Sequence, residues 1–270
     1  MTDVMSPPAR LAVIATLREA LGAWVKAAWP MLLLLLLYFG LIIAIVAVLD
    51  IVSGVFSMAT GGAVAASGLS FFDWIAVLLG VPLFLAITFR FNIAGYRLAD
   101  EIREGRRPRL IELLRDPRPN LLAFFGLNLL SFILIVLGLL LFIVPGVYIA
   151  LALSIVLLPM IFEDARVLDS MQRSVDLTRG NLLRILGVYL IVMLGYLVYS
   201  VVITSLDDGD RGEGAITPLL FALIAINAVI HLCFTTFSTM LQIVIYRRLR
   251  AMKDRPAQTD VAAPDPSPAP

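Results

Sequence analysis

The apolar positions of the chain form six long, almost uncharged runs that polar segments separate. Their approximate bounds are 31–50, 74–96, 121–144, 147–162, 182–206 and 216–246. A helix needs roughly 20 apolar residues to cross the hydrocarbon core of a bilayer, and most of these runs reach that length. The pattern therefore predicts an all-α membrane protein with six transmembrane helices.

The fourth run, 147–162, is the shortest, with one proline just before it and another near its end. Val144-Pro145-Gly146 is typical of a type II turn, which would join the third span to the fourth. A helix over the fourth run is roughly 24 Å long, shorter than the hydrocarbon core, and Pro159 predicts a kink or break. We expect this span to cross with help from its Pro-Gly end and from Glu163 reaching the interface.

Two segments outside the spans show apolar side chains at helical spacing. Residues 11–29 place bulky side chains on one face, namely Ile14, Leu17, Leu21, Trp24 and Val25, with Thr16, Glu19 and Lys26 opposite. Residues 167–179 place Leu168, Met171, Val175 and Thr178 on one face. The polar face carries Asp169, Arg173, Asp176 and Arg179, together with Arg166 just before the segment. Both patterns predict amphipathic helices on the cytoplasmic membrane face, where basic residues attract anionic lipid. The first should end near Pro30, because proline disrupts a helix interior.

The domain organisation follows from these elements. Residues 1–29 form an N-terminal segment with a surface helix, 30–250 form the six-span domain, and the Pro/Ala-rich tail 251–270 is expected to be disordered. Gly180 is expected just beyond the end of the second surface helix, and Asn181 is expected to cap the next helix. Asn120-Leu121-Leu122-x-x-x-Gly126 matches Asn181-Leu182-Leu183-x-x-x-Gly187. The match suggests three repeated units, each a surface helix followed by a hairpin, with chance similarity in a leucine-rich chain as the alternative.

Composition and charge agree with a membrane location and add an orientation. The chain is 60% hydrophobic with a mean hydropathy of +0.96, more apolar than a soluble domain. The connections 53–70, around 145 and 207–214 hold only Arg211 of the 21 Lys and Arg residues. The positive-inside rule then predicts a multi-pass protein of the cytoplasmic (inner) membrane with both termini cytoplasmic. A net charge of +1 gives no bulk attraction to nucleic acid.

Charged residues gather around the connection between the fourth and fifth spans. The candidate site there consists of Glu163, Arg166, Arg173, Arg179 and Arg184. One interpretation is interfacial anchoring with ion pairs, and the other is a lipid-headgroup or phosphate site, since arginine binds phosphate bidentately. We expect Glu163 to pair with Arg173, Arg179 or Arg184. The charged run 97–118 interleaves acids with bases and predicts a solvated cytoplasmic face.

His231, the only histidine, lies at the centre of the sixth span, one turn after Asn227, and Asn128 lies in the third span. An ionisable residue there suggests a proton relay or a substrate contact, and the alternative is hydrogen bonding between helices. The alternative is favoured, because no Asp, Glu or Lys lies at a span centre. One histidine and one cysteine cannot form a zinc site, and Walker A and G-x-S-x-G motifs are absent from the sequence. We therefore expect no metal, no cofactor and no enzymatic activity.

Three motifs carry a resemblance to a known family. They are P-G-V-Y at 145–148, Pro159 followed by Glu163, and S-M-Q-R-S-V-D-L-T-R-G-N at 170–181. The chain resembles the glycerophosphoryl diester phosphodiesterase membrane-domain family, which includes uncharacterised six-helix bacterial membrane proteins. The resemblance implies a six-helix layout over residues 10–250 but no activity. Some members carry a fused phosphodiesterase domain, for which this sequence has no soluble stretch of sufficient length.

Two functions remain open. The first is a non-enzymatic membrane protein that organises lipid or partner proteins in the bacterial cytoplasmic membrane, which the surface-seeking segments favour. The alternative is a small secondary transporter or channel for an amphipathic or lipid-like solute, for which Pro82, Gly95 and Pro159 are candidate helix breaks. The expected partners are membrane lipids, anionic ones included, and a homo-oligomer or a membrane-protein partner is left open.

Overall fold

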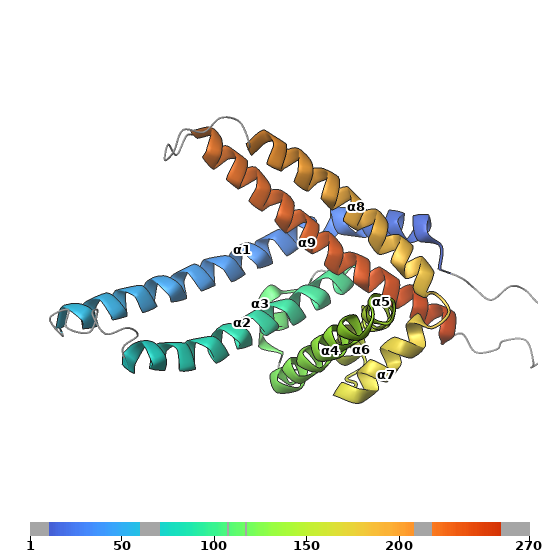
Figure 1. The fold of residues 1–270 in the computed structure, drawn as a ribbon, viewed down its shortest axis with the longest axis horizontal. Helices are drawn as coiled ribbons and strands as arrows, with labels where there is room; N and C mark the ends of the chain where they lie inside the picture. The colour runs from blue at the N-terminus through green and yellow to red at the C-terminus, as the bar shows by residue number, and fades with distance from the viewer. Residues whose placement is uncertain (1–10, 60–70, 107, 117, 208–217, 255–270) are drawn as a thin grey trace, which may run out of the picture.

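The computed structural model describes residues 11–59, 71–106, 108–116, 118–207 and 218–254, and within these ranges it contains helices and no strand. The helices are α1 (Val13–Ala59), α2 (Phe71–Arg103), α3 (Leu110–Arg115), α4 (Leu121–Leu141), α5 (Ile143–Ala152), α6 (Leu157–Phe162), α7 (Val167–Thr178), α8 (Leu182–Asp207) and α9 (Pro218–Lys253). Figure 1 shows two long pairs, α1 with α2 and α8 with α9, that diverge from a common end, and α4 to α7 pack near that end.

Five helical stretches in the described part are long and apolar enough to cross a membrane. They are Val13–Val48, Leu121–Leu141, Ile143–Phe162, Leu182–Ile203 and Ile226–Lys253. An all-α, multi-pass membrane fold is thereby confirmed. The predicted second span, 74–96, lies inside α2, which is not one of the five, so the count of six spans stays a prediction.

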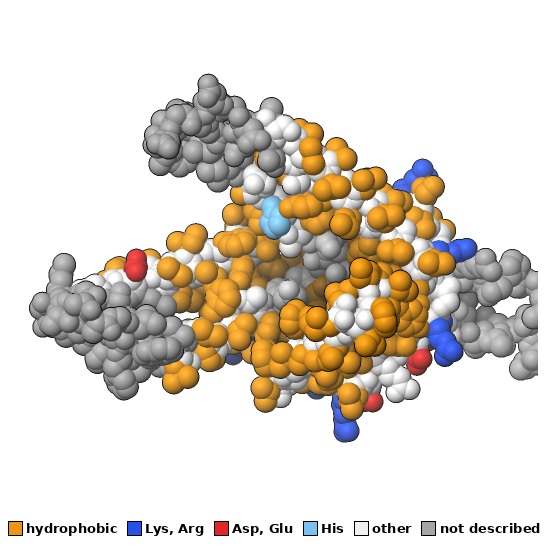
Figure 2. All heavy atoms as spheres, in the orientation of Figure 1, with side chains coloured by type: hydrophobic (Ala, Val, Ile, Leu, Met, Phe, Trp, Pro, Cys, Tyr) orange, Lys and Arg blue, Asp and Glu red, His pale blue; other side chains and the backbone are white. Residues whose placement is uncertain are grey.

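The second half of α9 is the centre of the fold. Its side chains Met240, Leu241, Ile243, Val244, Ile245 and Tyr246 are fully buried. This half of α9 is buried nearly all around, because α9 contacts α1, α2, α7 and α8. Figure 2 shows apolar side chains covering the outer surface of the spans, while charged side chains on this face gather mainly at the end where α9 ends. Such a surface suits lipid, which solvates large apolar side chains as well as a protein core does.

The N-terminal half of α1 differs from the prediction. Pro30 lies inside the continuous helix Val13–Ala59, so the expected helix end there is wrong. The buried positions in this half of α1 carry small residues, Thr16, Ala20, Ala23 and Ala27. Leu17 and Trp24 pack against the core, but Ile14, Leu21 and Val25 are exposed. Small residues let α1 approach α9 closely, which is how helices associate when lipid already solvates the large apolar side chains.

The turn between the third and fourth spans is also placed differently. Phe142, with extended backbone, separates α4 from α5, and Pro145 lies inside the first turn of α5. Proline is tolerated there because the first-turn N–H groups have no intrahelical partner. The type II turn predicted at Val144-Pro145-Gly146 is therefore wrong. Gly146 instead serves close packing, because a Cβ atom on it would lie 2.6 Å from the backbone nitrogen of Leu139.

The break predicted from Pro159 is present, but it begins earlier in the chain. α5 ends at Ala152 and α6 begins at Leu157. Pro159 has no N–H for the Ile155 carbonyl and its ring clashes with that carbonyl, so the helix is interrupted ahead of the proline. The Ile155 carbonyl instead accepts a tighter bond from Leu158 N at 3.1 Å.

α7 closes this break with hydroxyl groups. Ser170 donates to the Val156 carbonyl at 2.5 Å, and Ser174 donates to the Ala152 carbonyl at 2.7 Å. The Ala152 carbonyl needs a partner because Val156 N, which would bond to it in a helix, bonds to Leu153 instead. Ser170, Ser174 and Thr178 recur every fourth residue and are fully buried. α7 therefore packs its hydroxyl face into the protein, where the backbone of a broken span must be satisfied.

Replacing Ser174 by alanine should lower the free energy of unfolding by about 1–3 kcal/mol, because the buried Ala152 carbonyl keeps only the longer contact from Thr178, at 3.4 Å. Gln172→Ala, on the exposed side of the same helix, is the matched control and should change stability by less than about 0.5 kcal/mol. Thermal unfolding in detergent measures both variants. Equal stability of the two would show that the hydroxyl is not needed at the break.

The remaining predictions have mixed outcomes. Gly180 has φ +88° directly after the end of α7, which confirms it as the residue that ends this helix. Asn120 caps α4 by accepting from Leu122 N at 3.0 Å, whereas the side chain of Asn181 bonds outside its own helix, to Leu11 N. The two matching asparagines thus have different partners, and the three-unit repeat stays a prediction. Residues 53–59 of the connection 53–70 are helical. The rest of that connection, residues 208–214 of the connection 207–214 and the tail from 255 lie outside the described residues.

Candidate functional site

Glu163 lies where α6 ends and brings α7 and α9 together. Its carboxylate is 3.3 Å from Arg173 Nε and accepts a hydrogen bond from the Tyr246 hydroxyl at 2.5 Å. Arg250 lies 3.6 Å away, and Asp254 joins the group through Arg173 at 2.8 Å. The structure thus pairs Glu163 with Arg173, one of the three expected partners. Tyr246, Arg250 and Asp254 come from α9 or directly follow it, and sequence spacing gave no sign of them.

The other predicted members lie apart. Arg184 donates to the Leu11 carbonyl at 3.0 Å, and Asn181 accepts from Leu11 N at 3.0 Å, so these two hold the start of the described chain against α8. Arg166 and Arg179 are exposed, and the described residues offer their side chains no hydrogen bond or ion pair. The five predicted residues therefore do not form one site.

The electrostatics of the Glu163 group favour a structural ion-pair network over a phosphate site. Arg173 contacts the carboxylates of both Glu163 and Asp254, and Arg250 contacts the same two. Hydrogen bonds from Arg173 lower the pKa of Asp254 below its ordinary value, so Asp254 is ionised at neutral pH. Each guanidinium in the group thus already faces negative charge, which leaves little attraction for a phosphate.

A second network joins α1, α2 and α9 at the same end. Asp100 is 3% exposed, and Arg247 donates to both of its carboxylate oxygens, with Nε at 3.0 Å. Glu19 binds Arg103 at 2.7 Å and Arg248 at 2.6 Å. The solvated face predicted for 97–118 is therefore wrong at Asp100, which is buried against α9. The basic end of the sixth span joins helices to one another.

The structure separates the predicted intramembrane polar residues. Asn227 of α9 accepts from the Tyr199 hydroxyl of α8 at 2.9 Å, and the His231 side chain is exposed with its ring centroid 6.4 Å from that of Tyr196. Asn128 donates within its own helix, to the Phe124 carbonyl at 2.8 Å. Asn227 and His231 share the contact between α8 and α9, while Asn128 lies on α4 with a local bond. This arrangement gives His231 no acidic neighbour within the described residues to relay a proton with.

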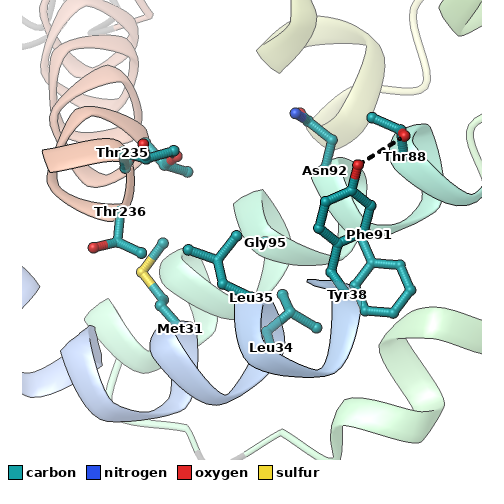
Figure 3. Close-up of a pocket in the computed structure, with 11 residues that line it drawn as sticks. Met31, Leu34, Leu35, Tyr38, Thr88, Phe91, Asn92, Gly95, Thr235 and Thr236 are labelled. Carbon is teal, nitrogen blue, oxygen red and sulfur yellow. Dashed lines mark hydrogen bonds between the residues drawn. The ribbon is translucent and has the colours of Figure 1, made fainter. Parts of the chain in front are cut away.

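A cavity of about 140 Å³ between α1, α2 and α9 is the site that sequence reasoning missed. Met31, Leu34 and Leu35 of α1 form an apolar side, and Figure 3 shows Asn92 and Gly95 of α2 facing Thr235 and Thr236 of α9 across it. Tyr38, Thr88, Phe91 and Thr239 complete the lining. All of these side chains are uncharged, so the cavity suits an uncharged group with both apolar and hydrogen-bonding parts.

A sequence signal for this cavity did exist. Thr88, Asn92 and Tyr96 recur every fourth residue in the second apolar run, and Thr235, Thr239 and Gln242 recur at similar spacing in the last. Each set lies on one face of its helix, and the two faces meet where Tyr96 donates to Gln242 at 2.5 Å. Only the structure shows that these two polar faces meet, because residue spacing does not reveal which helices are neighbours.

The cavity presents groups that can bind a small molecule. The described residues contain no group of three His, Cys, Asp or Glu side chains close enough together to hold a metal ion. The cavity itself is lined by hydroxyl, amide and apolar groups. Such groups orient a bound molecule through hydrogen bonds and apolar contact.

Comparison with known proteins gives one similarity. Residues 120–249 match the model of a family described as Domain of unknown function (DUF7847). The match runs from the N-cap of α4 almost to the end of α9, slightly less than half of the chain, and leaves the α1 and α2 walls of the cavity outside. No curated protein and no solved structure matches the chain. In its C-terminal half, this multi-pass membrane protein is thus similar to a domain family of unknown function.

Proposed function

We propose that this chain is a non-enzymatic membrane protein that binds and organises lipid in the bacterial cytoplasmic membrane. The observation that carries the proposal is the partly apolar, uncharged cavity between α1, α2 and α9. Two of its three walls, α1 and α9, contain stretches long and apolar enough to span a membrane. Hydrophobic walls with a few hydrogen-bonding groups are the usual composition of sites for small amphipathic molecules. The surroundings of these spans offer lipid as the most abundant such molecule.

The N-terminal half of α1 supports the same role. Ile14, Leu21, Val25 and Trp29 are between 52% and 73% exposed, although the helix packs its opposite face on α9. Arg18 and Lys26 are exposed beside them. An exposed apolar stripe with basic neighbours and a tryptophan suits the headgroup region of an anionic leaflet. In this proposal both termini lie on the cytoplasmic side, as the distribution of Lys and Arg predicts.

The alternative, a small transporter or channel, draws support from one feature, the discontinuous α5 and α6. In transporters, such breaks line a substrate site and leave backbone groups free to bind. Here the hydroxyls of Ser170 and Ser174 already occupy carbonyls at the break, and α7 covers it. We therefore interpret the break as a place where α7 packs against the chain and not as a substrate site. Lipid organisation is the better-supported function. Kinship with the glycerophosphoryl diester phosphodiesterase membrane-domain family remains a proposal that rests on the motifs alone.

Native mass spectrometry of the protein purified with its lipids tests the proposal. We expect lipid that survives activation strong enough to strip the annular shell, and we expect Gly95→Leu to lose it, because the new side chain fills the cavity. Gly126→Leu is the matched control, since Gly126 on α4 has no heavy atom within 4 Å of a Cβ. Retained lipid that is equal in both variants, or solute flux through the protein in liposomes, would contradict the proposal.

A further inference from the structure

The threonine hydroxyls of the cavity have no hydrogen left to donate to a ligand. Thr88 donates to the Phe84 carbonyl at 2.8 Å, Thr235 donates to the His231 carbonyl at 2.9 Å, and Thr239 donates to the Thr235 carbonyl at 3.1 Å. A hydroxyl has one hydrogen and two lone pairs. Each of these side chains therefore faces the cavity as an acceptor.

The hydroxyl hydrogens of Tyr38 and Thr236 are also used in bonds within the protein. Because the Thr88 hydrogen is used within α2, the 3.0 Å contact between Tyr38 and Thr88 must have Tyr38 as the donor. Thr236 donates to a carbonyl of its own helix and accepts from Trp24 Nε1 at 2.9 Å. Asn92 is the one lining side chain that offers N–H groups, and the described residues give it no hydrogen-bond partner. The polar wall is thus rich in acceptors and poor in donors.

A ligand complementary to this wall must bring hydrogen-bond donors. An alcohol supplies one donor, whereas an ether or an ester supplies none and can only accept a hydrogen bond from Asn92. A phosphate or carboxylate is disfavoured, because no cation lines the cavity and an unpaired buried charge is costly.

The size of the cavity sets how much of a lipid it can hold. At about 140 Å³ it is close to the engineered cavity of 150 Å³ that accommodates benzene. A headgroup such as a hydroxymethyl or a glycerol end fits with its first carbons, and the rest of the chain must lie outside. That remainder meets a lipid environment, because large apolar side chains are exposed along these spans.

We propose that the cavity between α1, α2 and α9 binds the hydroxyl end of an uncharged single-chain lipid, of the class of long-chain alcohols and monoacylglycerols. The ligand hydroxyl donates its one hydrogen to Thr235 or Thr239, which lie one turn apart on α9, and the first carbons lie against Leu34, Leu35 and Phe91. This inference rests on the proposed lipid-binding function and adds the chemistry of the headgroup.

Three probes of equal chain length test it: hexadecanol, hexadecyl methyl ether and hexadecyl phosphate, each titrated into the protein in nanodiscs and followed by native mass spectrometry. We expect hexadecanol to bind about fivefold more tightly than the ether, the range that one hydrogen bond provides, and the phosphate to bind most weakly. In the Thr235→Val, Thr239→Val double variant, hexadecanol should fall to the affinity of the ether, which should be unchanged. Ser205→Ala is the control, since this hydroxyl also donates within its own helix, at 2.7 Å, but lies on α8.

The outcomes separate this inference from the function on which it rests. Equal affinity for alcohol and ether, or a preference for the phosphate, would overturn the inference and leave a lipid-binding protein. An alcohol preference that survives in the double variant would likewise overturn it. Failure of all three probes, combined with lipid retention that Gly95→Leu leaves unchanged, would contradict the proposed function itself.

Discussion

Asp100→Asn should lower the free energy of unfolding on the order of 3 kcal/mol, the largest effect expected of any single change. Asp100 is 3% exposed, and both of its oxygens accept from Arg247. The substitution leaves the Arg247 guanidinium half-buried, and among the described residues only Glu104, at 3.5 Å, remains as a counter-charge. Most of the loss comes from this uncompensated charge, since forming the buried pair gains little over an apolar one.

That explanation makes a second measurement decisive. The double variant Asp100→Leu, Arg247→Met removes both charges, and we expect it to recover much of the stability that Asp100→Asn loses. Glu112→Gln is the control, because its pair with Arg109 is 3.6 Å apart with both side chains largely exposed, and it should change stability by less than about 0.5 kcal/mol. Unfolding in mixed micelles by denaturant measures all three. If Asp100→Asn costs no more than the control, the pair does not hold α2 to α9.

Gly146→Ala should destabilise the protein by about 1–3 kcal/mol through overpacking of the α4–α5 hairpin. A Cβ atom on Gly146 would lie 2.6 Å from the nitrogen and side chain of Leu139. The nitrogen belongs to the backbone of α4, so the contact can be relieved only by moving the helices apart. Gly138 lies on the other side of the same contact. A Cβ atom added to Gly138 would lie 3.0 Å from the Cα atom of Gly146.

Gly126→Ala provides the comparison, because it makes the same chemical change in α4. An added Cβ atom at Gly126 meets no atom of another part of the protein within 4 Å. We expect it to stabilise by about 0.5–1 kcal/mol, since alanine has the higher helix propensity. Thermal unfolding of the two variants under one detergent condition should therefore move in opposite directions. A gain in stability from Gly146→Ala would show that the hairpin does not depend on this close approach.

Local features were within reach of the sequence. The apolar runs predicted where helices would form, since each run is long and almost uncharged whatever surrounds it. The break ahead of Pro159 follows from a missing N–H group and a ring clash, both of which are properties of the chain. Gly180 ends α7 for a similar local reason, because its φ of +88° suits a residue without Cβ. The pairing of Glu163 with Arg173 was also within reach, since both lie on one short connection.

Only the tertiary structure decided which face of each helix meets another helix. In a membrane, lipid and protein interior are equally apolar, so hydrophobic periodicity does not distinguish the two. The predicted bulky face of α1 is accordingly divided: Leu17 and Trp24 pack against the core, whereas Ile14 and Val25 are exposed. Asp100 was placed in solvent for a related reason: its partner Arg247 lies 147 residues away in the sequence. The cavity could not be predicted for the same reason. Its polar side chains come from α2 and α9, and only the packing of these helices brings them face to face.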